Sequence, residues 1–258
     1  MGEFVTDRRK LCADIEAVAR LAGSAIMGVY ATDFSVRDKA DASPVTAADE
    51  RAEALILEAL KHLTPAVPVV SEEASAAGRT PSVAGRFWLV DPLDGTKEFI
   101  RRNGEFTVNI ALIEQGEPTL GVVFAPAHER LFSGISGHGA ALEEAGARRT
   151  ITCRTVPAGG LTVVSSRSHG DAAALAQFLR GRTVAANKHA GSSLKFCLVA
   201  AGEADLYPRL GRTMEWDTAA GDAVLRAAGG RVMTMDARPL QYGKPGFENP
   251  HFVAEGRV

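Results

Sequence analysis

Carboxylates at the ends of predicted strands are the residues of this chain whose types and spacing could do chemistry. Asp91 ends an apolar run, Asp94 comes three residues later, and Gly95 and Thr96 follow directly. Two carboxylates at a strand end can hold a hard cation through oxygen ligands. The glycine permits a tight turn, and the amides after it can bind phosphate oxygens, especially if a helix begins there. The run therefore predicts a metal or phosphate site, although a β-turn can have the same composition.

Further acidic residues occur in comparable positions. Glu72 and Glu73 follow the apolar run 67–71, and Asp217 stands just before a predicted helix. Ligand sites in open α/β sheets gather at strand ends, so these acids favour one shared site. Asp217 also fits the N-cap position of its helix, and one carboxylate can serve both as a cap and as a metal ligand.

Two amphipathic helices are predicted before these strands. The first is indicated by apolar residues at three- and four-residue steps between Leu11 and Val29. The polar segment 36–43 interrupts that pattern, and the second helix begins near Thr46. Thr46 and Asp49 have the N-cap and N3 spacing of a capping box, which places Asp49 in the first turn of the helix.

The rest of the chain predicts short strands and then an alternation of strands and helices. In the first half we expect strands at 67–71, 87–91, 106–113, 120–124, 131–135 and 140–143. In the second half we expect strands at 161–165, 183–186, 204–207 and 231–235 and helices at 172–179, 193–201 and 218–228. This order predicts an α/β (α+β) protein whose sheets are covered by helices. A weak break at 156–160 divides one compact unit into subdomains 1–156 and 157–258.

Composition excludes several classes of protein. The 258 residues contain 29 Lys+Arg and 31 Asp+Glu, so the net charge is 29 − 31 = −2, and 46% of the residues are apolar. This near-neutral balance argues against a nucleic-acid partner or a polybasic membrane binder. No run reaches the roughly 18–20 apolar residues of a transmembrane segment, and the N-terminus lacks the apolar core of a secretory signal. Cys12, Cys153 and Cys197 are widely spaced, so we expect buried thiols in a cytoplasmic protein, not a zinc site or disulfides.

Four motifs together, in their order and spacing, resemble the inositol monophosphatase superfamily. They are Val45-Thr46-Ala47-Ala48-Asp49, Ser71-Glu72-Glu73, Asp91-Pro92-Leu93-Asp94-Gly95-Thr96 and Trp216-Asp217-Thr218-Ala219-Ala220-Gly221. The resemblance covers nearly the whole chain. It implies a layered αβαβα sandwich and a magnesium-dependent, lithium-sensitive phosphomonoesterase.

Other runs are similar to one branch of that superfamily, the bacterial bisphosphate nucleotidases. Lys97-Glu98-Phe99 fits this branch, whereas inositol phosphatases usually carry Thr-Asn-Phe there; the runs 101–112, 166–169, 191–197 and 206–209 fit it as well. The resemblance implies removal of the 3′-phosphate of adenosine 3′,5′-bisphosphate, a small phosphorylated nucleotide of sulfur metabolism. It names 3′-phosphoadenylyl sulfate as a second candidate substrate. Inositol monophosphatase or fructose-1,6-bisphosphatase activity on the same scaffold is the alternative.

The resemblance also implies a role for each site residue. Two or more Mg²⁺ ions would be bound by Glu72, Asp91, Asp94, Asp217 and the carbonyl of Leu93. The catalytic residues would be Asp49, Glu72 and Thr96, because the Thr96 hydroxyl, oriented by Asp49, and Glu72 would position and activate the attacking water. Substrate contacts would come from Glu72, Leu93, Asp94, Gly95, Thr96, Ser192, Lys195, Arg209 and Asp217. Within this set, the amides of Gly95 and Thr96 would hold the scissile phosphate, and Lys195 and Arg209 would clamp the 5′-phosphate.

Two other interpretations compete with this one. The motif of aspartyl-phosphate phosphatases places two Asp residues two positions apart, whereas Asp91 and Asp94 are three apart with Pro92 between them. A non-catalytic phosphate-binding scaffold is the other, and the complete set of acidic residues argues against it. The sequence is compatible with a homodimer and with peripheral attachment to the inner membrane, and it requires neither.

Overall fold

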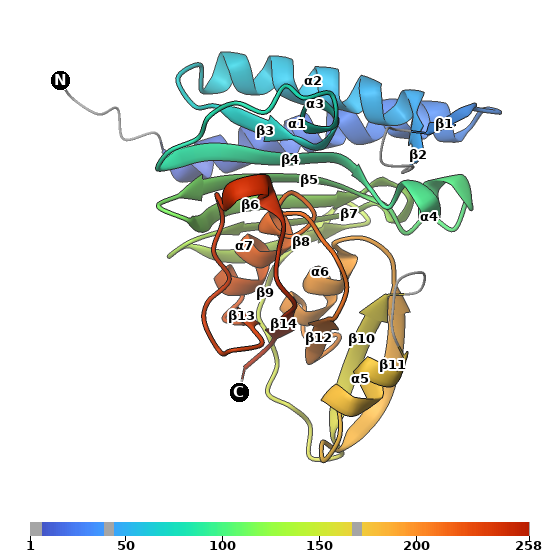
Figure 1. Ribbon diagram of the computed structural model, residues 1–258, viewed down its shortest axis with the longest axis vertical. Coiled ribbons are helices and arrows are strands. Elements are labelled where there is room, and N and C mark those ends of the chain that lie inside the picture. Colours follow the sequence, from blue (N-terminus) through green and yellow to red (C-terminus); the bar gives the residue numbers. More distant parts are fainter. Residues whose placement is uncertain (1–6, 39–43, 167–171, 258) are drawn as a thin grey trace.

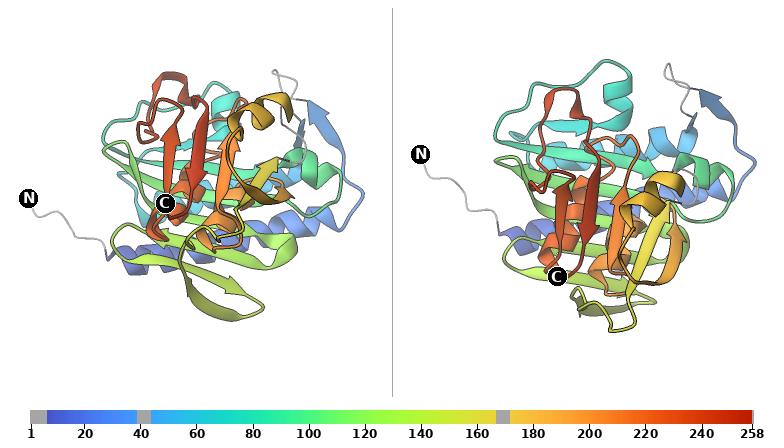
Figure 2. Two further views of the ribbon diagram at one scale, coloured as in Figure 1. Left: turned by 90° about the horizontal axis from the view of Figure 1, so that it is seen from below. Right: turned by 60° about the horizontal axis from the view of Figure 1, so that its bottom comes forward.

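Helices and sheets alternate in five layers in the computed structural model, which describes residues 7–38, 44–166 and 172–257 (Figures 1 and 2). α1 (Arg8–Tyr30) and α2 (Ala47–Leu63) cover one face of a seven-stranded sheet. α6 (Leu194–Ala200) and α7 (Ala219–Ala227) lie between this sheet and a five-stranded sheet, and α5 (Ala172–Phe178) lies beside the latter. The predicted αβαβα sandwich is confirmed.

The large sheet brings two of the acidic runs to one edge. Its strands, in spatial order, are β3 (Val69–Ser71), β4 (Arg86–Asp94), β5 (Thr107–Glu114), β6 (Glu117–Ala125), β7 (Arg130–Ile135), β8 (Gly139–Glu144) and β9 (Ala147–Ile151). β3 and β4 pair parallel, and the neighbours from β4 to β9 pair antiparallel. Because β3 and β4 are parallel, their carboxyl ends meet, and Glu72 follows one end while Asp91 lies near the other.

The small sheet belongs to the second half of the chain. Its spatial order is β11 (Val184–Ala190), β10 (Leu161–Ser166), β12 (Leu206–Arg209), β14 (Phe252–Glu255) and β13 (Arg231–Thr234). β10 pairs parallel with β11 and β12, whereas β14 pairs antiparallel with β12 and β13. Residues 152–160 carry the chain from β9 to β10, so the change of sheet falls at the predicted break. The division into two subdomains at 156 remains a prediction.

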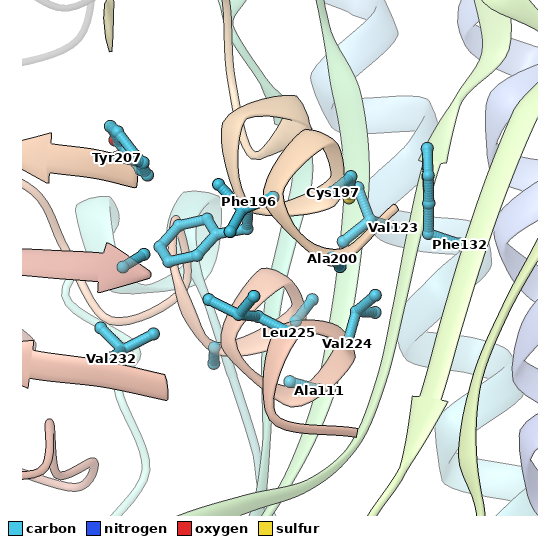
Figure 3. Packing of buried hydrophobic residues seen from close by; sticks show 14 of the residues in the cluster. Ala111, Val123, Phe132, Phe196, Cys197, Ala200, Tyr207, Val224, Leu225 and Val232 are labelled. Atoms are coloured by element: carbon cyan, nitrogen blue, oxygen red, sulfur yellow. The ribbon is translucent and has the colours of Figure 1, made fainter. Parts of the chain in front are cut away.

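Apolar clusters lie on both faces of the large sheet. On one face, Ile15 of α1 and Ile56 of α2 pack with Trp88 of β4. On the other face, α6 and α7 are buried between the two sheets, as Figure 3 shows for Phe196 and Leu225. Within the described ranges, no helix has both the length and the apolarity that crossing a membrane requires. The strands that carry the acidic residues therefore rest on packed helices on both sides.

α7 lies very close to the large sheet. A Cβ atom at Gly121 of β6 would stand 2.5 Å from the carbonyl oxygen of Ala220, a separation that real Cβ contacts do not reach. A glycine is therefore needed where the helix crosses the strand. Since Asp217 comes shortly before α7, this contact fixes how near Asp217 lies to the large sheet.

Most of the elements that the sequence missed are short. β1 (Val36–Asp38) and β2 (Pro44–Thr46) pair antiparallel where only a break in the pattern was expected, and β9 and β14 were not expected. The one-turn helices α3 (Glu72–Ala76) and α4 (Thr96–Ile100) and the 3₁₀ turns at Pro126–His128 and Pro245–Phe247 also come from the structure. Elements of three to five residues are too short to show a hydrophobic period.

The three cysteines are buried and unpaired, as the sequence predicts. Burial raises the pKa of the Cys12 thiol to about 12 and that of Cys153 to about 11. Burial also raises the pKa of Cys197, so none of the three is a thiolate at neutral pH.

Candidate active site

A pocket of about 720 Å³ collects the predicted site residues from both halves of the chain. Its lining includes ten of the eleven residues named from the sequence, namely Glu72, Asp91, Leu93, Asp94, Gly95, Thr96, Ser192, Lys195, Arg209 and Asp217. Asp49, the eleventh, is buried and reaches the pocket through a hydrogen bond with Thr96. A pocket of this volume suits a small molecule.

Three carboxylates form the acidic end of the pocket. Glu72, Asp91 and Asp217 each offer an oxygen, and these oxygens all lie within 4.8 Å of one another. Burial, together with the charges of Asp94 and Glu72, raises the pKa of Asp217 well above its usual range. Such a group of like charges is costly without a cation, and its oxygen-only donors are the kind that Mg²⁺ prefers. The residues therefore fit Mg²⁺, with Asp94 beside the group of three.

The end of β4 is irregular where it enters the pocket. The strand extends to Asp94, three residues beyond its predicted end, and its pairing with β5 shifts register between Asp91 and Asp94. The Leu93 amide donates to Asp91 Oδ1 at 3.0 Å. Gly95 then turns the chain with φ 94°, a left-handed conformation that favours glycine, and α4 begins at Thr96. Backbone amides at the start of a helix can bind an anion.

Thr96 is held by the capping box that the sequence predicts. Asp49 Oδ2 accepts from the Thr46 amide at 2.8 Å and from the Thr46 hydroxyl at 2.7 Å. Its other oxygen, Oδ1, accepts from the Thr96 hydroxyl at 3.2 Å. One carboxylate thus caps α2 and orients the hydroxyl at the start of α4, an arrangement that agrees with the predicted pairing of Asp49 with Thr96.

Asp217 does not cap α7, so that expectation is wrong. The N-cap residue is Thr218, and Asp217 Oδ2 instead accepts from the Met214 amide at 2.9 Å. The segment before the helix forms its own turn, which directs the Asp217 carboxylate towards Glu72 and Asp91.

A hydrogen-bonded chain that the sequence did not reveal joins the two halves of the site. Asn109 of β5 donates through Nδ2 to Asp94 Oδ2 at 3.2 Å and to Ser193 Oγ at 2.9 Å. Ser193 in turn donates to the Asp217 carbonyl at 2.6 Å. Asn109 and Ser193 are buried. The signal that could have found Asn109 is an amide inside the otherwise apolar run 106–113.

Glu53 holds the chain on both sides of Glu72, through the side chain of Ser71 and the backbone amide of Ala74. This buried residue of α2 accepts from the Ser71 hydroxyl at 2.5 Å and from the Ala74 amide at 3.0 Å. Because both contacts reach the same oxygen, Oε1, a glutamine could accept them as well. Glu53 is therefore a positioning residue for Glu72, which lies between the two donors.

We expect Glu53→Ala to weaken Mg²⁺ binding by about 10- to 100-fold, since residues that orient metal ligands have effects of this size. Glu53→Gln should bind Mg²⁺ nearly as the wild type does, because its amide oxygen keeps both contacts. Calorimetric titration of the two purified variants measures this difference, and denaturant unfolding checks that both are folded. Equal affinities in the two variants would contradict the role assigned to Glu53.

Two cationic side chains, Lys195 and Arg209, line the same pocket, and their charges act on Asp94 and Asp217 respectively. Lys195 is buried, and its ammonium donates to the carbonyls of Ala190 at 3.3 Å and Ser192 at 2.5 Å. Burial lowers the pKa of Lys195 to about 8, although the charge of Asp94 opposes this. Arg209 donates through Nη2 to the Arg212 carbonyl at 2.7 Å, while its buried Nε has no partner among the described residues. The Lys195 ammonium has three donors, so one remains beyond the two in use, and the Arg209 guanidinium likewise has donors beyond the one bound to the Arg212 carbonyl.

The run 166–169, which the resemblance places near the nucleotide, is described only at its first residue. Ser166 lines the pocket. Arg167, Ser168 and His169 lie outside the described residues.

Comparison with known proteins agrees with this arrangement. The model of the inositol monophosphatase family matches residues 7–256. The 3′(2′),5′-bisphosphate nucleotidase CysQ of Escherichia coli K12 is 52% identical over 238 residues, which cover 91% of this chain and 95% of that protein. The crystal structure of CysQ from Bacteroides thetaiotaomicron matches with a TM-score of 0.81 at 35% identity, covering 99% of both chains. An inositol monophosphatase from Anabaena matches with a TM-score of 0.76 at 27% identity, covering 97% and 92%. The chain therefore belongs to the inositol monophosphatase family.

Proposed function

We propose that this chain is a Mg²⁺-dependent 3′(2′),5′-bisphosphate nucleotidase that releases the 3′-phosphate of adenosine 3′,5′-bisphosphate. The observation that carries the proposal is the position of the Glu72–Asp91–Asp217 carboxylate group in the same pocket as Thr96, which is bound to Asp49. The similarity to bacterial enzymes of this name, over nearly all of both chains, supports the choice of substrate.

The carboxylates of the pocket would hold the metal. Glu72, Asp91, Asp94 and Asp217, with the Leu93 carbonyl, offer oxygen ligands for two or more Mg²⁺ ions. When bound, Mg²⁺ supplies charge neutralisation for the phosphate and lowers the pKa of water. The amides of Gly95 and Thr96, at the start of α4, would hold the scissile phosphate, since both residues line the pocket.

Thr96 and Glu72 would handle the attacking water. The Thr96 hydroxyl has one hydrogen, which is directed at Asp49 Oδ1 at 3.2 Å and the Leu93 carbonyl at 3.3 Å, so its oxygen is left to accept a hydrogen bond from water. Glu72 is the carboxylate that would take the proton as the water attacks. Ser192, Lys195 and Arg209 then remain for the part of the substrate that is not cleaved.

A substrate panel tests the proposal. With Mg²⁺ present, we expect the highest kcat/KM on adenosine 3′,5′-bisphosphate, a lower value on 3′-phosphoadenylyl sulfate, and much lower values on inositol 1-phosphate and fructose 1,6-bisphosphate. Chelation by EDTA should abolish phosphate release, and added Mg²⁺ should restore it. A higher kcat/KM on inositol 1-phosphate would overturn the assignment.

Arg209→Gln should impair recognition of the retained 5′-phosphate. A charge-assisted hydrogen bond contributes about 1.5–3 kcal/mol, so we expect KM for adenosine 3′,5′-bisphosphate to rise by at least tenfold. Hydrolysis of inositol 1-phosphate, which has no second phosphate, should change little. Arg212→Gln is the matched control, because Arg212 also lines the pocket but is exposed and bound to Glu248 at 3.1 Å. The same loss on both substrates in Arg209→Gln would contradict the clamp.

A further inference from the structure

We propose that the C-terminal turn 243–249, which we call the base wall, carries the aromatic face on which the substrate's purine base lies, with Phe247 as the stacking residue. The inference rests on the proposed function and adds to it the residue that recognises the base. No motif in the segment from Tyr242 onwards predicts a role in specificity. In the structure, Gly246 and Phe247 line the same pocket as the carboxylates.

Backbone contacts join the base wall to the segment that carries Asp217. The Glu215 amide donates to the Phe247 carbonyl at 2.8 Å, and the Asn249 amide donates to the Thr213 carbonyl at 2.9 Å. These two contacts lie on either side of Met214, which forms an isolated antiparallel bridge with Glu248. The base wall is thus an added strand-like edge of segment 213–218, and not a free loop.

A buried carboxylate locks the turn. Glu215, which is fully buried, accepts from the amides of Gly243 at 2.6 Å and Lys244 at 2.9 Å. The Lys244 ammonium also donates to Glu215 at 2.6 Å and to the side-chain oxygen of Asn249 at 3.1 Å. A buried charge is retained without destabilising a protein when it is paired and hydrogen-bonded, as here. Glu215 therefore fixes the start of the turn, and the Lys244 ammonium links Glu215 to Asn249 at its end.

Asn249 fastens the turn a second time. Its side-chain amide donates to the Met214 carbonyl at 2.8 Å and to the Thr218 hydroxyl at 3.0 Å. Met214 and Thr218 stand on either side of Asp217, whose carboxylate accepts from the Met214 amide. The position of Phe247 and the position of the metal ligand Asp217 are thus set by one network.

Phe247 has an aromatic setting that fits stacking. Its ring packs edge-on against Phe87 with centroids 6.4 Å apart, and lies at 35° to Trp216 with centroids 6.3 Å apart. Trp216, the neighbour of Asp217, is mostly buried and also lines the pocket. Phe247 itself is half-buried and holds φ 55°, a conformation that a bulky residue adopts only when its surroundings enforce it. The ring is thus supported from behind and presented to the pocket.

A planar base is the part of the substrate that this face suits. Aromatic side chains stack on nucleobases, and such contacts tolerate different bases because each has a π-face. A cyclic polyol such as inositol has no π-face and cannot use the wall in this way. Under the proposed function the metal held by Asp217 and its neighbours binds the scissile phosphate. Trp216 is the next residue to Asp217, and Phe247 is joined to the same segment through the Glu215 amide, so both rings lie near that end of the substrate.

Ligand binding by wild type and Phe247→Leu tests the base wall. Leucine keeps apolar contact with Phe87 but has no aromatic face. We expect Phe247→Leu to bind 5′-AMP about 10- to 100-fold more weakly in calorimetry with Mg²⁺, and to bind ribose 5-phosphate, which lacks the base, as the wild type does. Phe247→Tyr should bind 5′-AMP like the wild type. An unchanged affinity for 5′-AMP in Phe247→Leu, or an equal loss of affinity for both ligands, would refute stacking of the base on Phe247.

Tryptophan fluorescence gives a second measurement. The protein has two tryptophans, and Trp88 is fully buried and bound to Thr64 at 2.9 Å, so 5′-AMP should quench only Trp216. The quenching should be absent in Trp216→Phe, and in Phe247→Leu half-maximal quenching should require a higher concentration of 5′-AMP. Quenching that persists in Trp216→Phe would contradict the placement of the base. The proposed function is judged separately, by phosphate release from adenosine 3′,5′-bisphosphate in the wild type. If that release is absent while 5′-AMP binding still depends on Phe247, the function fails and the base wall stands.

Discussion

Asp94→Asn is expected to lower kcat by roughly a thousandfold, because it removes a charge from the group that would hold Mg²⁺. The change is conservative in shape, and the asparagine oxygen can still accept the hydrogen bond that Asn109 donates at 3.2 Å. Burial raises the pKa of Asp94, and the charge of Glu72 adds to this, so the metal-free wild type carries an unfavourable carboxylate here. Denaturant unfolding without metal should therefore show Asp94→Asn to be at least as stable as the wild type.

The decisive comparison for Asp94→Asn is the dependence of turnover on Mg²⁺ concentration. The variant should need more Mg²⁺ and still not reach the wild-type rate at saturation. Glu73→Gln is the matched control, since it removes a carboxylate next to Glu72 that lies outside the group of three and outside the pocket lining. Wild-type turnover of Asp94→Asn at limiting Mg²⁺ would refute the assignment of this residue.

Thr96→Val is expected to lower kcat by about 10²- to 10⁴-fold, the range that general acid–base groups contribute. Valine has the shape of threonine but cannot receive a hydrogen bond from the attacking water or donate one to Asp49. Oδ2 of Asp49 would still cap α2 through Thr46, so the fold should persist. Mg²⁺ binding, measured by calorimetry, should remain within a few-fold of the wild type because no carboxylate is lost.

Thr96→Ser is the control that separates the hydroxyl from the methyl group. The serine hydroxyl can make the same contact with Asp49 Oδ1, so much of the activity should return. Single-turnover measurements at saturating substrate show whether the loss lies in the chemical step. Equal rates in the serine and valine variants would exclude a role for the Thr96 hydroxyl.

The parts of the site that could be predicted from the sequence are those formed by residues only a few positions apart, whose spacing determines their contacts. The capping box of Thr46 and Asp49 needs only residues three apart, and the structure confirms it. The Asp91–Asp94 run and Glu72 both follow predicted strands, and they were grouped because ligand sites gather at strand ends. Asp217 was grouped with them as a further acid before a predicted helix, and the family resemblance made it a metal ligand of the same site, since nothing local relates residues 91 and 217.

The unpredicted parts depend on contacts between distant segments. Asn109 reaches Ser193 across 84 positions, and Glu53 reaches Ser71 across 18, so no local pattern could pair them. Both residues could still be noticed in the sequence. Asn109 is a polar residue among the apolar residues of a predicted strand, and Glu53 is a charged residue on the buried face of a helix. Phe247 had no such signal, because its turn has no period and takes its shape from Glu215 and Asn249.

The three carboxylates that would share a cation have a consequence for how the chain reaches its folded state. Glu72 and Asp217 are 217 − 72 = 145 residues apart, and their oxygens meet only when both sheets are in place. A cation bound by all of them binds the folded chain and not the unfolded one, so it adds about 2.7 kcal/mol of stability at a hundredfold excess over its dissociation constant. A chain still being synthesised, with Asp91 made and Asp217 not yet made, has no such gain. Magnesium would thus stabilise only the completely folded chain. The metal that serves the reaction would also make the complete chain more stable than a partly synthesised one.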